Sequence, residues 1–286
     1  MKSKMQYFGS LWLLFVCMHL ADPQELLFSS SFADSVAMDM AKNSIDDRYS
    51  TCARKMEEKV QSIFFQKEME NEPFKTVWQY CVKKIENTEN GGEGLTNYHR
   101  EAICAYTAGQ PENLYLTFNN KVRTMRDAYG SSFPFHSLHF WLTTAVQILK
   151  KSDKNRCYTT FRRTDAIFTG DLKQEIRLGQ FVSTSFESNL AHFGTRTCFN
   201  ITTCYGADLK SYSEFEDEKE VLIPPYEKFK IIGKTTKIPD CEIVYVLKST
   251  GVQSNLNCKL ANKCHGDYFL PTLIYAIVTF HLLLNL

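Results

Sequence analysis

Residues 218–227 read Glu218-Lys219-Glu220-Val221-Leu222-Ile223-Pro224-Pro225-Tyr226-Glu227, so that two glutamates lead directly into an apolar run. A short run of Val, Leu and Ile that is closed by prolines is typical of a buried β-strand. Side chains alternate along a strand, and Glu218 and Glu220 are therefore expected to project from the same face. A carboxylate next to a buried strand is partly removed from water and interacts strongly with nearby cations. This stretch predicts a strand that carries two carboxylates at its beginning.

Two further polar clusters precede this stretch on predicted strands. The first is Phe161-Arg162-Arg163-Thr164, in which an arginine pair closes an otherwise apolar strand. The second is Val182-Ser183-Thr184-Ser185-Phe186, in which Ser183 and Ser185 share one face. Each cluster alone is also explained as a solvated strand face, so only their combination indicates chemistry.

The rest of the chain divides near Lys150. Before this residue, apolar positions at helical spacing predict helices, which span 51–67, 77–84, 97–109, 113–127 and 135–150. After it, short runs rich in Thr, Phe, Val, Ile and Tyr predict strands, which span 157–162, 180–186, 196–204, 219–223, 228–232 and 242–248. Residues 22–50 form a polar lead-in with little periodicity. Helices followed by strands predict an α+β fold, and no Gly-x-Gly-x-x-Gly motif supports a Rossmann dinucleotide site.

The composition excludes several classes of protein. The 286 residues include 33 Lys and Arg against 32 Asp and Glu, and this balance gives no electrostatic basis for binding nucleic acid. A content of 13% aromatic residues is that of a packed globule rather than a disordered chain. Ten cysteines without zinc-type spacing favour disulfides in an oxidising compartment, and no metal site is expected.

Both ends of the chain carry targeting signals. Two lysines, an apolar run over 7–20 and Ala21 predict a secretory signal peptide over residues 1–21, with a retained signal anchor as the alternative. Residues 268–286 contain no charged side chain. Small and polar residues precede them, which is typical of a glycosylphosphatidylinositol (GPI) attachment signal over 261–286, with a tail-anchored helix as the alternative. Ala261 or Asn262 is the expected attachment residue, and eight cysteines then remain. We expect a protein anchored in the outer leaflet of the plasma membrane.

One N-glycosylation sequon, Asn200-Ile201-Thr202, agrees with secretion. It lies in a predicted strand, and its occupancy is left open.

The order arginine, Ser-Thr-Ser, Glu-x-Glu resembles the signature of the arginine-specific mono-ADP-ribosyltransferases, which are vertebrate cell-surface enzymes and some bacterial toxins. Further matching stretches are Asp46-Asp47-Arg48-Tyr49-Ser50-Thr51-Cys52, Phe168-Thr169-Gly170, Arg177-Leu178-Gly179-Gln180-Phe181 and 220–227. The likeness covers roughly residues 45–260, and among vertebrate members it looks closest to the Dombrock blood-group type. It implies the ADP-ribosyltransferase fold, with an N-terminal segment and helical part over 22–150 packed on a strand-rich NAD-binding core of two small sheets over 151–260.

The resemblance also implies transfer of ADP-ribose from NAD+, as co-substrate, to arginine side chains of extracellular or cell-surface proteins. Glu220 would stabilise the oxocarbenium-like state as the bond to nicotinamide breaks. Arg162 would bind the pyrophosphate, and Ser183 would orient Glu220 and the ribose. Glu218 would position the acceptor guanidinium and help to remove its proton, and without Glu218 water would be the acceptor. Two other positions are expected to contact the dinucleotide, Asn119 through its amide and Phe193 by stacking on nicotinamide.

The chain also departs from the family pattern. Arg163 stands where the family usually has a glycine, and it either points away, adds a phosphate contact or impairs cofactor binding. The segment from Phe186 to Cys198 is shorter than in several relatives. These departures keep two alternatives open, a catalytically weak or inactive surface antigen or adhesion protein with the same fold, and an enzyme that is chiefly an NAD+ glycohydrolase.

The resemblance implies two disulfides, Cys157–Cys204 and Cys52–Cys258. The other four cysteines are expected to pair as Cys81–Cys104 and Cys198–Cys241, with buried free thiols as the alternative.

Overall fold

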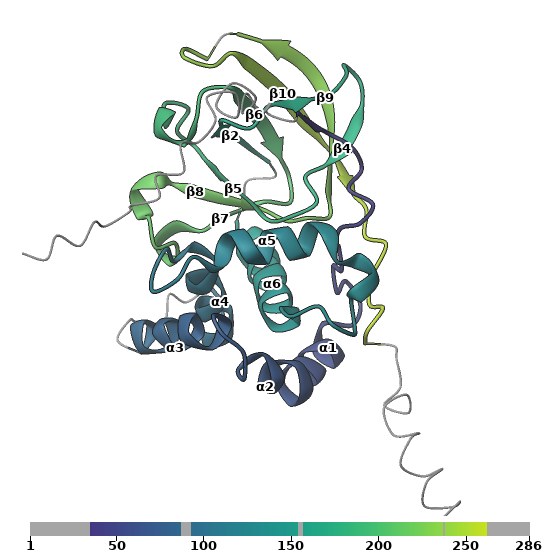
Figure 1. Cartoon of the computed structure of the whole chain (residues 1–286), viewed down its shortest axis with the longest axis vertical. Coiled ribbons are helices and arrows are strands. Elements are labelled where there is room, and N and C mark those ends of the chain that lie inside the picture. The colour runs from purple at the N-terminus through teal and green to yellow at the C-terminus, as the bar shows by residue number, and fades with distance from the viewer. Residues whose placement is uncertain (1–34, 87–92, 154–156, 237, 262–286) are drawn as a thin grey trace, which may run out of the picture. The chain divides into compact units, whose positions relative to one another are not determined.

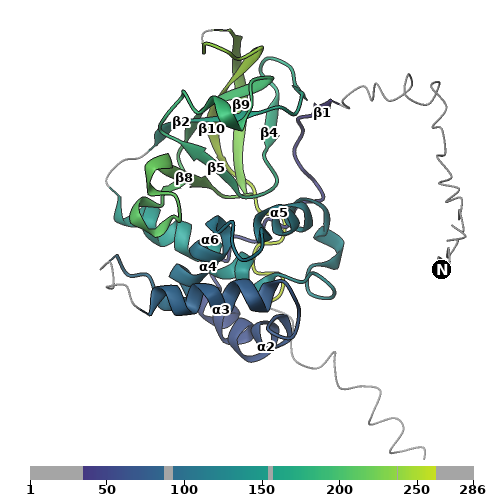
Figure 2. The same cartoon turned by 60° about the vertical axis from the view of Figure 1, so that its left-hand side comes forward.

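Helices occupy the first half of the chain and strands the second, as the change of periodicity near residue 150 predicts. The computed structural model describes residues 35–86, 93–153, 157–236 and 238–261. In both views the helices form one layer of this part of the chain and the strands form the other (Figures 1 and 2). The predicted signal peptide, Asn262 and the apolar tail lie outside the described residues. Within the described part of the chain, no helix is long and apolar enough to cross a membrane.

The helical layer of the described residues contains six α-helices. They are α1 (Ala53–Lys59), which continues through a π-helical stretch (Val60–Phe64) into α2 (Phe65–Glu68), then α3 (Phe74–Ile85), α4 (Asn97–Thr107), α5 (Leu114–Thr124) and α6 (His136–Ser152). All residues of helix α6 from His136 to Val146 are buried, the polar ones included. This helix therefore lies inside the core, where it packs against α4 and against the strand layer.

The described residues contain ten strands, six at the expected positions in the second half and four short ones that were not expected. They are β1 (Val36–Ala37), β2 (Tyr158–Thr164), β3 (Phe168–Thr169), β4 (Glu175–Arg177), β5 (Val182–Ser185), β6 (Thr197–Thr203), β7 (Ala207–Asp208), β8 (Glu220–Ile223), β9 (Glu227–Thr235) and β10 (Ile243–Val252). Strands β1 and β3 pair in parallel as a two-stranded sheet. The other strands follow the order β4-β9-β10-β6-β2-β5-β8-β7.

The eight-stranded sheet is nearly divided between β2 and β5. These two strands share a single pair, Phe161 with Ser185, whereas β2 pairs with β6 over its whole length. The expected core of two small sheets is therefore present as a five-stranded and a three-stranded half that meet at one residue pair. The three-stranded half packs on the helical core through Leu222 and Ala207. A second buried cluster includes Phe199, Ile231 and Leu247 of the five-stranded half, and Val182 and Ile223 of the three-stranded half join it.

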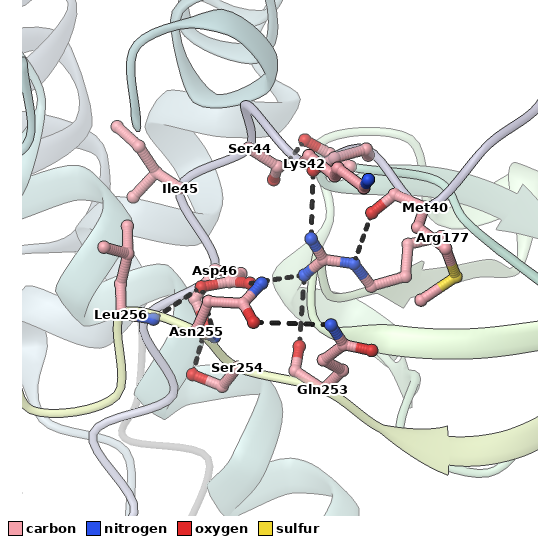
Figure 3. A network of polar contacts seen from close by, with 12 residues as sticks. Met40, Lys42, Ser44, Ile45, Asp46, Arg177, Gln253, Ser254, Asn255 and Leu256 are labelled. Carbon is pink, nitrogen blue, oxygen red and sulfur yellow. Dashed lines mark hydrogen bonds and ion pairs between the residues drawn. The ribbon is translucent and has the colours of Figure 1, made fainter. Parts of the chain in front are cut away.

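The lead-in expected to be merely polar is packed into the fold from residue 35 onward. Arg177 on β4 donates to the carbonyls of Met40 and Ala41 and forms a fully buried ion pair with Asp46 (Figure 3). Asp46 also accepts hydrogen bonds from the backbone N–H groups of Asn255 and Leu256, each 2.9 Å long. One carboxylate and one guanidinium thus join the beginning of the described chain, β4 and the segment after β10.

All four expected disulfides are present: Cys52–Cys258, Cys81–Cys104, Cys157–Cys204 and Cys198–Cys241. The alternative of buried free thiols at Cys81, Cys104, Cys198 and Cys241 is therefore wrong. Cys52–Cys258 closes the same junction as the Asp46–Arg177 pair.

Candidate active site

A cavity of about 430 Å³ lies where β2 and β5 separate. Its walls come from the ends of these two strands, from the α4–α5 connection and from the segments that precede β6 and β8. The lining residues are Tyr106, Thr107, Ala108, Gly109, Asn113, Tyr115, Phe161, Arg162, Arg163, Thr164, Ser183, Thr184, Ser185, Glu187, Leu190, Phe193, Phe215, Glu218 and Glu220. The volume is in the range of small-molecule and cofactor sites.

Glu220, the first residue of β8, is the most buried carboxylate of this lining. It is 5% exposed and accepts a 2.7 Å hydrogen bond from the Ser213 hydroxyl. A second hydroxyl, that of Ser183, is also hydrogen-bonded to it. Burial raises the pKa of Glu220, while the bonds from Ser183 and Ser213 and the charge of Arg162 oppose that rise. The site therefore holds a desolvated carboxylate between two hydroxyls.

Behind Ser183 the polar contacts continue into the helical layer. Tyr106, at the end of α4, is hydrogen-bonded to Ser183 and donates to the carbonyl of Phe181 over 3.1 Å. Asn119 on α5 donates to the Tyr106 hydroxyl and accepts from the Phe181 N–H, over 3.2 Å in each case. Asn119 is only 3% exposed and does not line the cavity. Its amide supports Tyr106 inside the protein, and the expected contact with the dinucleotide stays a prediction.

Arg162 lines the cavity in a fixed orientation. Its Nη1 donates to the Ser183 carbonyl over 2.7 Å and its Nη2 donates to the Tyr115 hydroxyl over 3.1 Å. Because a guanidinium has five N–H donors, these two contacts leave donors for an anionic ligand. Tyr115 comes from α5, so the helical layer helps to aim this cation.

Glu218 reaches the cavity by a different route from the one expected. Strand β8 begins only at Glu220, and Glu218 ends a 3₁₀ turn (Glu216–Glu218). Lys219 between them has φ +47°, in the left-handed region that non-glycine residues seldom adopt. The shared-face argument from strand alternation is therefore wrong, although both carboxylates line the cavity. Partial burial raises the pKa of Glu218, and the charge of His192 opposes that rise.

Two aromatic side chains lie at the edge of the cavity. Phe193, in a 3₁₀ turn before β6, is 46% exposed, and Phe215, just before the Glu218 turn, is 49% exposed. Large exposed aromatic rings beside a cavity are candidates for contact with a flat ligand or an acceptor protein. The position of Phe193 agrees with the expected stacking role.

Arg163, for which three roles were considered, is bonded inside the protein. Its guanidinium donates to the carbonyls of Ser188 and Pro239, over 2.9 and 3.3 Å, on two loops. The residue is 7% exposed and borders the cavity without filling it.

The structure thus brings Arg162, Ser183, Glu218, Glu220 and Phe193 to one cavity and leaves Asn119 behind its wall. Tyr106, Tyr115 and Ser213 were missed, because they lie in helical or irregular segments where ordinary packing also explains a tyrosine or serine. Among the described residues, no cluster of His, Cys, Asp and Glu could hold a metal ion. Asn200, the sequon asparagine, is partly exposed in the middle of β6, between β2 and β10.

Comparison with known proteins assigns this geometry to a family. The family model described as NAD:arginine ADP-ribosyltransferase matches residues 38–254. The erythroblast NAD(P)(+)–arginine ADP-ribosyltransferase of Gallus gallus is 35% identical over 80% of this chain and 77% of its own. Ecto-ADP-ribosyltransferase 4 of Homo sapiens is 34% identical over 83% and 79%. The GPI-linked NAD(P)(+)–arginine ADP-ribosyltransferase 1 of Mus musculus is 31% identical over 80% and 74%. These similar identities do not single out the Dombrock type.

Solved structures agree with the sequence comparison. The eukaryotic mono-ADP-ribosyltransferase ART2.2 superposes with a TM-score of 0.65 at 31% identity, over 78% of this chain and 98% of that one. A mutant of ART2.2 in complex with NAD gives the same TM-score at 30% identity.

Proposed function

This chain belongs to the NAD:arginine ADP-ribosyltransferase family, and from that membership we propose that it transfers ADP-ribose from NAD+ to arginine side chains of extracellular or cell-surface proteins. The observation that carries the proposal is the convergence of Arg162, Ser183, Glu218 and Glu220 on one cavity. These groups come from β2, from β5 and from the beginning of β8 with the turn before it. They are far apart in the sequence, and the fold brings them together.

The cavity fits NAD+ by the chemistry of its donors. Arg162 offers a planar cation, already oriented by Tyr115, to the pyrophosphate. Glu220 offers a desolvated carboxylate to the ribose, and Phe193 offers an exposed ring to nicotinamide. The pyrophosphate, the ribose and the nicotinamide of NAD+ thus each have one matching side chain in the cavity.

The proposed reaction breaks the bond between ribose C1′ and the nicotinamide nitrogen. Nicotinamide leaves with the bonding electron pair as a neutral molecule, and positive charge develops on the ribose. The buried Glu220 carboxylate stabilises that charge, because an ion acts more strongly in a desolvated site than in water. Ser183 and Ser213 hold this carboxylate in one orientation.

The acceptor is an arginine guanidinium, which is too weak a nucleophile while it remains protonated. In our proposal a guanidinium nitrogen forms the new bond to C1′, and its proton passes to Glu218. The pKa of Glu218 is raised by desolvation, which makes its carboxylate a better proton acceptor than an exposed one. Its partial exposure at the cavity edge would let a protein side chain reach it.

A direct test uses protein produced from the full-length chain in secretory cells, with labelled NAD+ and agmatine as an arginine analogue. Transfer predicts a labelled agmatine conjugate. Free ADP-ribose without conjugate would support the NAD+ glycohydrolase alternative, and neither product would support the inactive surface protein. An E220Q variant serves as the control for background chemistry.

For location, we propose the extracellular face of the plasma membrane, with a GPI anchor at Ala261 or Asn262. The charge-free C-terminal run supports this, and one relative is named GPI-linked. Treating intact cells with a phosphatidylinositol-specific lipase should release the protein into the medium. Retention on the cells after lipase treatment would contradict the anchor.

A further inference from the structure

Arg163 lies beside the cavity and links two loops that are far apart in sequence. It sits on β2 opposite Cys198, and its guanidinium donates to the carbonyls of Ser188 and Pro239. One acceptor, the Ser188 carbonyl, belongs to the loop between β5 and β6. The other, the Pro239 carbonyl, belongs to the connection between β9 and β10. The second loop is itself anchored by the Cys198–Cys241 disulfide.

The first loop contains what we call the rim segment, residues 186–194. It contributes Glu187, Leu190 and Phe193 to the cavity lining. Its beginning is held by Glu187, which pairs with Lys219 over 2.6 Å and donates its N–H to the Ser185 hydroxyl. Its end is held at Gly194, where an added Cβ would lie 2.3 Å from the carbonyl carbon of Thr164. Both ends are therefore fixed.

Between these ends, a hydrogen bond from Arg163 connects the rim segment to β2. The described backbone hydrogen bonds of residues 189–194 run within the segment, from Ala191 to Asn189, from Phe193 to Leu190 and from Gly194 to Ala191. The bond from Arg163 to the Ser188 carbonyl instead connects the segment to β2. Phe193 follows on the same loop, five residues after the carbonyl that Arg163 holds.

Burying the Arg163 guanidinium lowers the stability of the folded state. Arg163 is buried, and none of the ion pairs within the described part of the chain includes it. Its Nη1 is buried with no hydrogen-bond acceptor there. A buried cation with incomplete partners destabilises the folded state, and such costs tend to persist where they serve a functional site.

We propose that Arg163 is a positioning residue for the transfer reaction, and that its two carbonyl contacts hold the rim segment so that Glu187 and Phe193 face the cavity. The inference rests on the proposed function for its kinetic consequence. Its structural consequence, an ordered rim segment, does not depend on activity.

The test replaces Arg163 by Met in the full-length chain, because Met keeps much of the apolar stem and removes all donors. The KM for NAD+ is expected to rise about tenfold, the scale of one lost charge-assisted hydrogen bond, with a smaller change in kcat. Amide hydrogen exchange should become faster over residues 188–194 while the melting temperature does not fall. R163K should give intermediate values, since one ammonium cannot reproduce the fork to two carbonyls.

The matched control is R196A, which removes a nearby arginine that forms only a surface pair with Glu242 at 3.8 Å. It should change neither KM nor exchange in the rim segment. An unchanged KM and unchanged exchange in R163M would overturn the proposal, as would a lower melting temperature with KM unchanged, which would indicate a purely structural arginine. If the wild-type protein is inactive, the proposed function fails, while exchange and equilibrium NAD+ binding still decide the role of Arg163.

Discussion

Ser213 donates a 2.7 Å hydrogen bond to the carboxylate of Glu220, which lies seven residues further along the chain. Burial works against the charged form of Glu220, and this bond works in its favour. The balance between the two effects determines at what pH the carboxylate is ionised. It also determines how well the carboxylate is oriented toward the cavity.

Replacing Ser213 by Ala should therefore shift the pH dependence of the reaction. Without the hydroxyl, the pKa of Glu220 rises further above its usual value, since one of the contacts that lower it is gone. The acidic limb of the kcat/KM profile should move to higher pH, and kcat should fall about tenfold. An acidic limb that stays in place would show that Glu220 is not the group that limits activity at low pH.

Replacing Glu220 by Gln should reduce turnover by roughly 10²-fold or more for transfer and hydrolysis alike, the scale of losing one transition-state charge contact. The neutral amide avoids the desolvation cost of a buried charge, so the melting temperature should not fall. E227Q is the matched control, because Glu227 is also a buried carboxylate, bonded to Thr203 and Cys204 outside the cavity. Activity per folded molecule should be normal in E227Q, and a similar loss in both variants would contradict a special role for Glu220.

Glu218 is predicted to govern the acceptor rather than the breaking of the bond to nicotinamide. E218Q should suppress the labelled agmatine conjugate while free ADP-ribose still forms, because water needs less help than a protonated guanidinium. Product analysis by chromatography separates the two outcomes. Equal loss of both products would refute the role assigned to Glu218.

The Asp46–Arg177 pair should be a major determinant of stability. Both side chains are fully buried, and removing one leaves an uncompensated charge. R177M is expected to lower the free energy of unfolding by about 3–5 kcal/mol. The control is K228A, which breaks the surface pair with Glu175 at 3.6 Å and should cost less than about 1 kcal/mol. Urea unfolding with the disulfides intact measures both, and similar losses would contradict the special weight of the buried pair.

Asp47 should make stability depend on pH between its unfolded and folded pKa values. Burial raises the pKa of Asp47 from 3.8 to about 6, although Cys258 and Tyr49 donate backbone hydrogen bonds to it. Between these values the folded state binds the proton more tightly. The contribution to stability is therefore complete below pH 3.8 and lost as the pH rises through about 6.

D47N removes this titration and keeps an acceptor oxygen for the two backbone amides. The difference in unfolding free energy, wild type minus D47N, should fall by about 1 kcal/mol from pH 5 to pH 7. A difference that is constant over that range would mean that Asp47 does not titrate there.

Much of the fold could be predicted because its signals are local. The strands β2, β5, β6, β8, β9 and β10 each carry a run of β-forming residues, and helices α3 to α6 carry a 3.6-residue apolar period. Strands β1, β3, β4 and β7 have two or three residues each, too few to show any period, and they were missed. Glu218 was assigned to a strand face because the apolar run after it hides the left-handed turn at Lys219.

The site shows the same division. Arg162, Ser183 and Glu220 lie on strands with polar interruptions that a sequence reveals. The sequence does not predict the roles of Ser213, Tyr106 and Tyr115. Each acts through a contact with a residue of another segment, and no local pattern around it indicates that contact. Asn119 was assigned to the ligand because an amide side chain looks the same whether it faces a cavity or a tyrosine hydroxyl.

By itself, the sequence determined the family, the class of chemistry and the order of the reactive side chains, because these depend on residue identity and short-range pattern. Only the tertiary structure decided that β2 and β5 separate after one shared pair, that Asn119 supports Tyr106 and that Arg163 donates to two loop carbonyls. Those outcomes depend on packing between segments distant in the chain, and the free energy of such contacts is not encoded in any one stretch of residues.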